Sequence, residues 1–388
     1  MKNSVGQAVR GDNFWNRKNE LAAIWEAIDS GSHILLVAPR RVGKTSIMFN
    51  LQDNPKEDYI VIYVDTESAD SENEFWQKLF NVLMEEEFIG KLKKYTKKFG
   101  IFLEETSIDK IGTKGVEFGD GTVVDYATAF EKLVKELDSG KKLIIMIDEF
   151  AQTVENIIKY ENEKNAQSFL RTHRALRQNE NLANKVTFVY AGSIGLESVV
   201  TKMNASKLIN DLNSIKVKPL IFKDALEFTQ ILSKSVSIEL DDNVSTILLE
   251  KIEWLIPFYI QLLIQELGQL GREIRQNNID EAMIDTAIER ALSHRHLFDH
   301  WRSKLKEGFK KKGYLFAKEI LNTICNEDTM TSLSISNTAS KHELDDDYAR
   351  EIIHSLAYDG YINNNDDVKV YRFNSPILKL WWYKNVAN

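Results

Sequence analysis

The sequence is poor in the features that mark secreted and membrane proteins. It contains a single cysteine, Cys325, so an internal disulfide is excluded and a reducing, cytoplasmic location is expected. It also lacks an apolar run of the roughly 18 residues that span a bilayer, because its longest apolar stretch, 254–264, is short and contains Pro257. The N-terminus is polar and has no apolar centre of the kind found in signal peptides. We therefore expect no association with a membrane.

An excess of positive charge is lacking as well. The formal net charge is −8, which argues against a surface that is basic throughout and leaves only a local basic patch open for nucleic acid. The hydrophobic content of 43% and the charged content of 28% are those of a folded globular protein. A length of 388 residues predicts two or three domains.

Apolar runs alternate with helical patterns in the first half of the chain. The runs have no polar alternation, which predicts strands that are buried on both faces. They are residues 33–38, 59–64, 143–147 and 186–191. Strands that alternate with helices predict an α/β fold with a parallel sheet. A lysine-rich and glycine-punctuated stretch at about 90–125 interrupts the pattern, and we predict an insertion with a β-hairpin there.

Strand patterns disappear after residue 220 and return only near the C-terminus. Consecutive helical patterns fill 224–294, and three further helices are followed by two short β runs around an Asn/Asp-rich turn. The latter order is typical of a winged helix. We therefore predict three domains: an α/β domain at 1–220, a helical lid at 221–300 and a winged helix at 301–388.

Residues 38–45 read A-P-R-R-V-G-K-T, follow a predicted strand and precede a predicted helix. This context fits a P-loop, in which the backbone N–H groups of a loop and a helix N-terminus bind phosphates. Gly43 permits the tight turn, Lys44 would reach the β- and γ-phosphates, and the Thr45 hydroxyl would bind Mg²⁺. The pattern has glycine where this chain has Ala38, which requires a negative φ or a shifted loop. The alternative is a basic turn after a core strand.

The whole loop is a candidate site for ATP. The residues expected to contact the nucleotide are Ala38, Pro39, Arg40, Arg41, Val42, Gly43, Lys44, Thr45 and Ser46.

Polar side chains end two other predicted strands. Asp148 and Glu149 follow the run at 143–147, and Ser193 follows the run at 186–191. Ligands of open α/β sheets bind at the carboxyl edge, where these residues should emerge. Asp148 suits Mg²⁺ binding through water, and Glu149 suits activation of the attacking water. Ser193 would contact the γ-phosphate or that water, although a simple Gly-Ser turn is an equal alternative.

Three arginines recur on one predicted helix. Arg171, Arg174 and Arg177 are spaced at i, i+3 and i+6 and therefore lie along one side of it. Arg174 and Arg177 are candidates for fingers that reach the γ-phosphate of a neighbouring subunit, and we include Arg177 among the catalytic candidates. A solvated helix face paired with acidic residues is the alternative.

Several segments together resemble the archaeal-type ATPases, a family in the AAA+/STAND branch of P-loop proteins that is related to origin-recognition ATPases. The segments are 13–21 (NFWNRKNEL), 38–46 (APRRVGKTS), 144–150 (IIMIDEF) and 190–195 (YAGSIG). The tail at 371–382 (YRFNSPILKLWW) is similar to the winged-helix end of such proteins. The resemblance covers nearly the whole chain except the insertion.

The resemblance also implies roles for residues outside the strands. The adenine pocket is implied to be lined by Phe14, Trp15, Asn16 and Arg17. Ser193 matches the sensor position of the family. In the lid, where the family often has G-H-P-[FY]-Y, the chain has L-I-P-F-Y at 255–259. Pro257 matches as a candidate nucleotide contact, but the histidine is missing, which puts a histidine contact from the lid in doubt.

The C-terminal segment 313–388 contains 7 basic and 11 acidic residues. Three of the acids, Asp345, Asp346 and Asp347, stand at the start of the helix expected to enter a DNA groove, where they would repel phosphate. A protein partner is therefore favoured over DNA for the winged helix.

Three functions are compatible with these residues. The first is an ATP-hydrolysing switch that couples nucleotide state to assembly, as a possible homo-oligomer, or to partner binding. The second is an origin-recognition-like ATPase that binds DNA. The third is a scaffold that binds ATP or ADP for stability and turns over little.

Overall fold

The computed structural model describes residues 1–83, 110–112, 115–117, 123–135, 141–193 and 195–387. They form two compact units. The first, which we call the sheet unit, comprises Arg17–Ala38 and Lys44–Val217. The second, the helical unit, comprises Met1–Asn16, Pro39–Gly43 and Lys218–Asn388. Within the described residues, every helix is too short or too polar to cross a bilayer.

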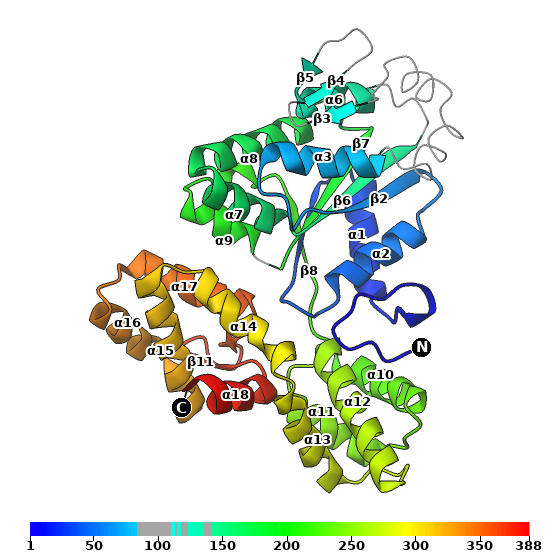
Figure 1. Ribbon diagram of the computed structural model, residues 1–388, viewed down its shortest axis with the longest axis vertical. Helices are drawn as coiled ribbons and strands as arrows, with labels where there is room; N and C mark the ends of the chain where they lie inside the picture. Colours follow the sequence, from blue (N-terminus) through cyan, green and yellow to red (C-terminus); the bar gives the residue numbers. More distant parts are fainter. Residues whose placement is uncertain (84–109, 113–114, 118–122, 136–140, 194, 388) are drawn as a thin grey trace. The chain divides into compact units, whose positions relative to one another are not determined.

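The sheet unit is built on five parallel strands in the order β2-β6-β7-β1-β8 (Figure 1). The strands are β1 (Ile34–Val37), β2 (Tyr59–Asp65), β6 (Lys142–Asp148), β7 (Val186–Ala191) and β8 (Asn213–Lys216). The first four are the strands predicted from apolar runs, which confirms the α/β fold and the parallel sheet. The edge strand β8 carries mostly exposed side chains, so the sequence has no apolar run that would predict it.

The two faces of the sheet are covered by different helices. On one face, alternate residues such as Ile145 and Phe188 join a core with buried residues of α3, α6, α7, α8 and α9, among them Trp76 and Phe169. On the other, α1 and α2 contact strands β1, β8 and β2. Residues buried on both faces explain why the strands read as continuous apolar runs. The helices are α1 (Lys18–Asp29), α2 (Lys44–Asp53), α3 (Glu72–Leu83), α6 (Tyr126–Lys135), α7 (Phe150–Tyr160), α8 (Glu163–Arg177) and α9 (Leu196–Lys202).

The predicted insertion contains a small antiparallel sheet. Strands β3 (Lys110–Gly112) and β4 (Gly115–Glu117) form the predicted hairpin, and β5 (Val123–Val124) pairs with β4. The lysine-rich run at 91–98 lies outside the described residues.

The helical unit begins, after its N-terminal segment, with a bundle of four helices. They are α10 (Phe222–Ser235), α11 (Asp242–Ile252), α12 (Pro257–Ile274) and α13 (Glu281–Ser293). Their starts follow local chemistry: Asp241 and Asp280 accept hydrogen bonds from backbone N–H groups of α11 and α13, and Pro257 stands at the first position of α12. These helices occupy the region predicted as a helical lid.

The rest of the helical unit contains helices and a three-stranded antiparallel sheet, β10-β11-β9. The elements are α14 (Arg295–Glu307), α15 (Lys311–Glu327), β9 (Met330–Thr331), α16 (Ser332–Lys341), α17 (Asp346–Tyr358), β10 (Ile362–Asn363), β11 (Val370–Phe373) and α18 (Pro376–Trp382). Trp381 and Trp382 are fully buried, and Trp381 stacks on Phe298 of α14 with ring centroids 5.7 Å apart. These tryptophans are therefore core residues. That the elements from α15 onward work as a winged helix stays a prediction.

Candidate functional site

The loop between β1 and α2 has the backbone of a tight turn. Gly43 has a φ of +107°, a conformation that side chains rarely allow, so glycine is required there. Ala38 is buried and is not among the residues with positive φ, which removes the objection to alanine at this position. The left-handed conformation falls instead on Arg41, with a φ of +65°.

Two residues at the start of α2 meet the end of β6 within the sheet unit. The Thr45 hydroxyl donates a hydrogen bond of 2.7 Å to Oδ2 of Asp148. The Lys44 side chain is buried, and its Nζ donates to the carbonyl oxygen of Ala38 at 3.2 Å. The ammonium group is thus held inside the loop, where a phosphate would attract it.

Asp148 is a buried carboxylate with a full set of donors. Tyr63, from the end of β2, donates to Oδ2 at 3.2 Å, and the backbone N–H of Glu149 donates to Oδ1 at 3.1 Å. Burial, followed by the charge of Glu149, raises the pKa of Asp148 above its usual value, and the hydrogen bond from Thr45 acts in the opposite direction. A cation beside this carboxylate would relieve that electrostatic cost.

Glu149 is fixed by the neighbouring strand. Its backbone adopts φ +56° at the N-cap of α7, and its Oε2 accepts from both the N–H and the Oγ of Ser193, at 2.9 and 2.8 Å. Ser193 follows β7, and β7 lies directly beside β6 in the sheet. Adjacent parallel strands therefore bring the predicted acid and the predicted sensor together at one edge.

The donor set fits Mg²⁺. The Thr45 hydroxyl and the Asp148 carboxylate are hard oxygen ligands, and Mg²⁺ in nucleotide sites takes few protein ligands and completes its shell with phosphate and water. Among the described residues no cluster of three or more His, Cys, Asp and Glu forms a self-sufficient metal site. Thr45 and Asp148 would hold the cation.

Arg41, the residue with left-handed backbone in the loop, contacts other residues of the helical unit. The loop residues Pro39–Gly43 belong to that unit. The Arg41 guanidinium lies 4.3 Å from the ring centroid of Phe258, the residue after Pro257. Its Nη2 is 3.4 Å from Nδ1 of His300. Burial and the charges of Arg41 and Arg40 lower the pKa of His300 to about 2, so the ring is neutral and Nδ1 accepts. These contacts hold the guanidinium against α12 and α14, and a phosphate contact of Arg41 stays a prediction.

The N-terminal motif is split between the two units. Trp15 stacks on Phe228 of α10, with ring centroids 5.2 Å apart. Arg17 is buried in the sheet unit and pairs with Glu20 at 2.8 Å. Asn16 and Arg17 both have positive φ, so the chain turns sharply at these two residues just before α1 begins. A role for Phe14 and its neighbours in binding adenine stays a prediction.

Arg177 does not occupy a position suited to a finger. It is buried, and its Nε and Nη2 donate to the two carboxylate oxygens of Asp211 at 2.7 and 2.9 Å. Nη2 also donates to the carbonyl oxygen of Leu208 at 2.7 Å. A bidentate, buried guanidinium has a structural role, which corrects the prediction that Arg177 is catalytic. Arg174, which is half-buried and donates to the carbonyl oxygen of Lys207, remains the candidate.

The sequence did not single out Tyr63 or His300, and it offered Phe258 only as part of the lid motif at 255–259. Tyr63 belongs to an apolar run that predicts a strand, and its register beside β6 (Tyr63↔Met146) is what brings its hydroxyl to Asp148. The sequence offers one sign of this role: Tyr63 carries a hydroxyl group and lies close to the carboxyl end of its strand.

Comparisons with known proteins agree with this geometry. The model of a family described as an ATPase domain predominantly from Archaea matches residues 14–253. A search of curated proteins found no match. Among solved structures, a Walker-type ATPase of Pyrococcus abyssi is similar over 99% of this chain and 100% of its own, with a TM-score of 0.68 and 17% identity. The ORC2 protein of Aeropyrum pernix, in ADPNP–ADP complexes, is similar over 100% and 98%, with a TM-score of 0.58 and 9% identity. At these identities the structures support the fold alone.

Proposed function

Because this chain belongs to the family of ATPase domains found predominantly in Archaea, we propose that it is a Mg²⁺-dependent, ATP-hydrolysing molecular switch. The observation that carries the proposal is the meeting of Thr45 with Asp148 and of Ser193 with Glu149 at one edge of the sheet. These pairs supply the groups needed for cation binding and for activation of water.

Each residue has a distinct part in the proposed reaction. Lys44 leaves its contact with the Ala38 carbonyl and neutralises charge on the β- and γ-phosphates. Thr45 and Asp148 would hold Mg²⁺, which would supply neutralisation of charge on the phosphate oxygens. Glu149 orients the attacking water and accepts its proton. Ser193 holds the carboxylate of Glu149 in place.

The switch is proposed to act through Arg41. This loop residue sits on Phe258 and His300, while its neighbours Lys44 and Thr45 serve the phosphate and the cation. A nucleotide that reshapes the loop would therefore change the contacts of α12 and α14. Such a differential contact is what a nucleotide needs in order to shift a conformational equilibrium.

The output is proposed to be a change in homo-oligomeric assembly or in binding of a protein partner through the predicted winged helix. Arg174 is the proposed finger towards a neighbouring subunit. A reducing, cytoplasmic location also belongs to the proposal, since Cys325 is a buried free thiol.

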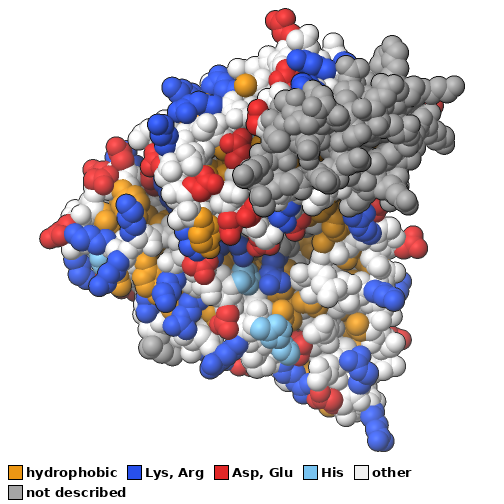
Figure 2. All heavy atoms as spheres, turned by 45° about the horizontal axis from the view of Figure 1, so that its top comes forward, with side chains coloured by type: hydrophobic (Ala, Val, Ile, Leu, Met, Phe, Trp, Pro, Cys, Tyr) orange, Lys and Arg blue, Asp and Glu red, His pale blue; other side chains and the backbone are white. Residues whose placement is uncertain are grey.

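DNA binding is a second candidate, because the Aeropyrum pernix protein is an ORC2 protein. Charge argues against it. On the face drawn in Figure 2, basic and acidic side chains of the described residues are interspersed, and neither sign fills a broad area. A nucleotide-stabilised scaffold with little turnover is the third candidate.

The test is steady-state hydrolysis of Mg²⁺-ATP by the wild type and by Glu149→Gln, with nucleotide affinity measured separately. We expect Glu149→Gln to lose at least about a hundredfold in kcat and to keep its affinity for ATP. The exposed Glu180→Gln is the matched control and should behave as the wild type. Equal turnover of wild type and Glu149→Gln would refute hydrolysis at this site, and nucleotide binding without turnover in the wild type would establish the scaffold.

A further inference from the structure

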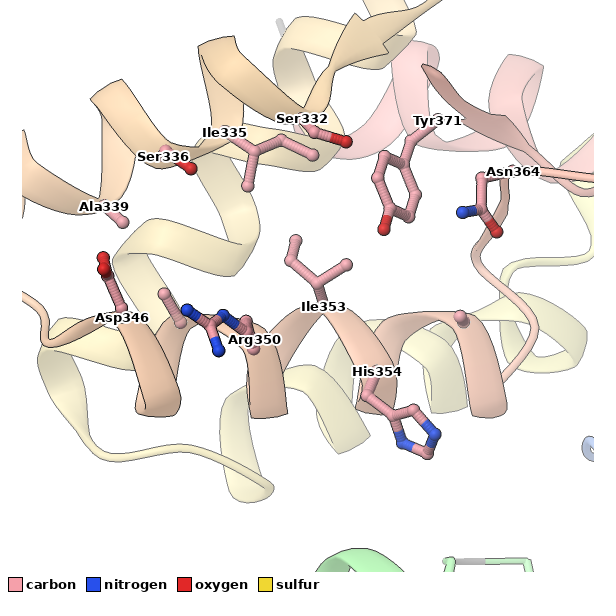
Figure 3. A pocket seen from close by; sticks show the side chains of 12 residues that line it. Ser332, Ile335, Ser336, Ala339, Asp346, Arg350, Ile353, His354, Asn364 and Tyr371 are labelled. Atoms are coloured by element: carbon pink, nitrogen blue, oxygen red, sulfur yellow. The ribbon is translucent and has the colours of Figure 1, made fainter. Parts of the chain in front are cut away.

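A groove separates α16 and α17 in the C-terminal part of the helical unit (Figure 3). It has a volume of about 510 Å³. Ile335 of α16 and Ile353 of α17 point towards each other across it, and the ring of Tyr371 from β11 closes one end beside Asn364. Asp346, at the start of α17, stands at the opposite end. The groove thus follows the length of two neighbouring helices.

The floor of the groove is apolar and lined by small side chains. Ile335, Ala339, Ala349 and Ile353 are buried, and Ala357 is half-buried. Alanines on both helices leave space that larger residues would fill, and burial of an aliphatic side chain there is favourable by about 25 cal/mol for each Å² of apolar surface removed from water. The groove is therefore suited to apolar anchors from a partner.

Exposed apolar residues flank the closed end. The N–H and Oγ of Ser332 donate to the carbonyl oxygen of Lys369, at 2.7 and 3.2 Å. This joins the start of α16 to the turn between β10 and β11. The residues next in sequence, Leu333 and Val368, are 72% and 75% exposed. Two large apolar side chains so exposed beside an apolar groove are typical of an interaction surface.

The charges at the two ends of the groove are acidic. Asp346 lines one end, next to Asp345, whose carboxylate caps α17 by accepting from Tyr348 N–H at 2.8 Å. At the other end, the turn after Asn364 carries Asp367, while the neighbouring Asp366 is paired with Arg372 at 2.8 Å. The lining arginine, Arg350, lies 3.5 Å from Asp347. A phosphate backbone would meet these carboxylates unfavourably, whereas lysine and arginine side chains would complement them.

We propose that this groove binds an amphipathic helix of a partner protein, with apolar residues at i, i+4 and i+7 and basic residues at both ends. The apolar residues occupy the alanine-lined floor, in the manner of a helix in a groove. The basic residues lie beside Asp346 and beside Asp367. The inference rests on the proposed role of the C-terminal elements in partner binding, and it names the chemistry of that partner.

The probe is a synthetic helical peptide with leucines at i, i+4 and i+7 and lysines at both ends, titrated into the full-length protein by fluorescence anisotropy. A second peptide carries glutamates in place of the lysines, and a fluorescent DNA duplex is tested in parallel. We expect saturable binding of the lysine peptide, binding of the glutamate peptide weaker by at least tenfold, and no competition by the duplex.

Two variants alter the groove by different means. Ala357→Leu fills the floor, and Asp346→Lys reverses the charge at one end; each should weaken binding of the lysine peptide by tenfold or more. Glu327→Lys makes the same charge change at an exposed site that lines a different hollow, and it should bind as the wild type does. Wild-type binding that is absent, or that Asp346→Lys and Ala357→Leu leave unchanged, overturns the proposal, as does competition by DNA.

The outcome is independent of hydrolysis. ATPase activity is measured on the same variants and should stay at the wild-type value, because Asp346 and Ala357 belong to the C-terminal elements and the hydrolytic residues belong to the sheet unit. Absence of peptide binding in the wild type together with normal turnover refutes the groove alone, and loss of turnover in Glu149→Gln with intact peptide binding supports the ATPase separately.

Discussion

Ser193 donates two hydrogen bonds to one oxygen of Glu149, from its N–H at 2.9 Å and from its hydroxyl at 2.8 Å. The two residues end neighbouring strands, so the position of the carboxylate is set by the sheet and not by the loop around it. The left-handed backbone of Glu149, φ +56°, is a strained conformation that its surroundings must maintain. Ser193 is therefore a positioning residue for the proposed base.

Ser193→Ala should lower kcat with little change in KM. A hydrogen bond to a charged group contributes about 1.5–3 kcal/mol, which corresponds to roughly a tenfold to hundredfold loss. Steady-state ATPase kinetics measure both constants. Ser193→Thr keeps the hydroxyl and should recover most of kcat. A large rise in KM with unchanged kcat would instead assign Ser193 to nucleotide binding.

Phe258→Leu should uncouple Arg41 of the loop from helices α12 and α14. The substitution keeps an apolar side chain at the start of α12 but removes the ring beneath Arg41, a contact of about 0.5–2 kcal/mol. We expect nucleotide to protect the backbone of α14 from hydrogen exchange in the wild type and not in the variant. Phe222→Leu, at an exposed phenylalanine of α10, is the control. Equal protection in wild type and Phe258→Leu would contradict a role for Arg41 in coupling.

The sequence predicted the parts of the molecule whose chemistry is local. Apolar runs marked four of the five strands, β1, β2, β6 and β7, because the side chains on both faces of those strands are largely covered. The position of Asp148 and Glu149 after such a run placed them at the carboxyl edge, where the structure has them. In contrast, β8 is held at the sheet edge by backbone pairing with β1 while its side chains are mostly exposed. No side-chain pattern is needed for such a strand, so none was found.

Residues whose role depends on a distant partner were not predictable. The spacing of Arg174 and Arg177 on α8 indicated a shared helix side, but the burial of Arg177 depends on Asp211, which is far along the chain. The contacts of Arg41 could not be predicted either, because its partners are distant in the sequence. Its place inside a phosphate-binding motif suggested phosphate, and only the fold brings Phe258 and His300 to it.

Arg177→Ala should destabilise the sheet unit. It leaves the carboxylate of Asp211 without its bidentate partner, and breaking a buried pair costs about 3–5 kcal/mol. Urea-induced unfolding of the full chain measures the loss. Arg171→Ala, at an exposed position of the same helix, should change stability by less than about 0.5 kcal/mol. Unchanged stability with lost activity in Arg177→Ala would restore it as a catalytic residue.

His33 makes the stability of the sheet unit depend on pH. Its Nδ1 accepts from the backbone N–H of Phe188 at 3.0 Å, so its Nε2 carries the proton and donates to the carbonyl oxygen of Arg177 at 3.2 Å. Burial lowers the pKa of His33 from 6.5 to about 4. The unfolded chain therefore binds a proton at higher pH than the folded chain does. The contribution of the neutral His33 ring to the stability of the folded chain is complete above pH 6.5, and it is lost as the pH falls from 6.5 through 4.

This loss should be visible in thermal unfolding between pH 7 and pH 4. Protonation places a hydrogen on Nδ1, against the N–H of Phe188, and we expect a contribution of roughly 2 kcal/mol to the free energy of unfolding. His33→Asn retains an acceptor for that N–H but does not titrate, so its Tm should fall less steeply with pH than that of the wild type. His296→Asn, at an exposed histidine, should keep the wild-type slope. If His33→Asn and the wild type lose stability in parallel, the neutral ring of His33 is not the source of the acid sensitivity.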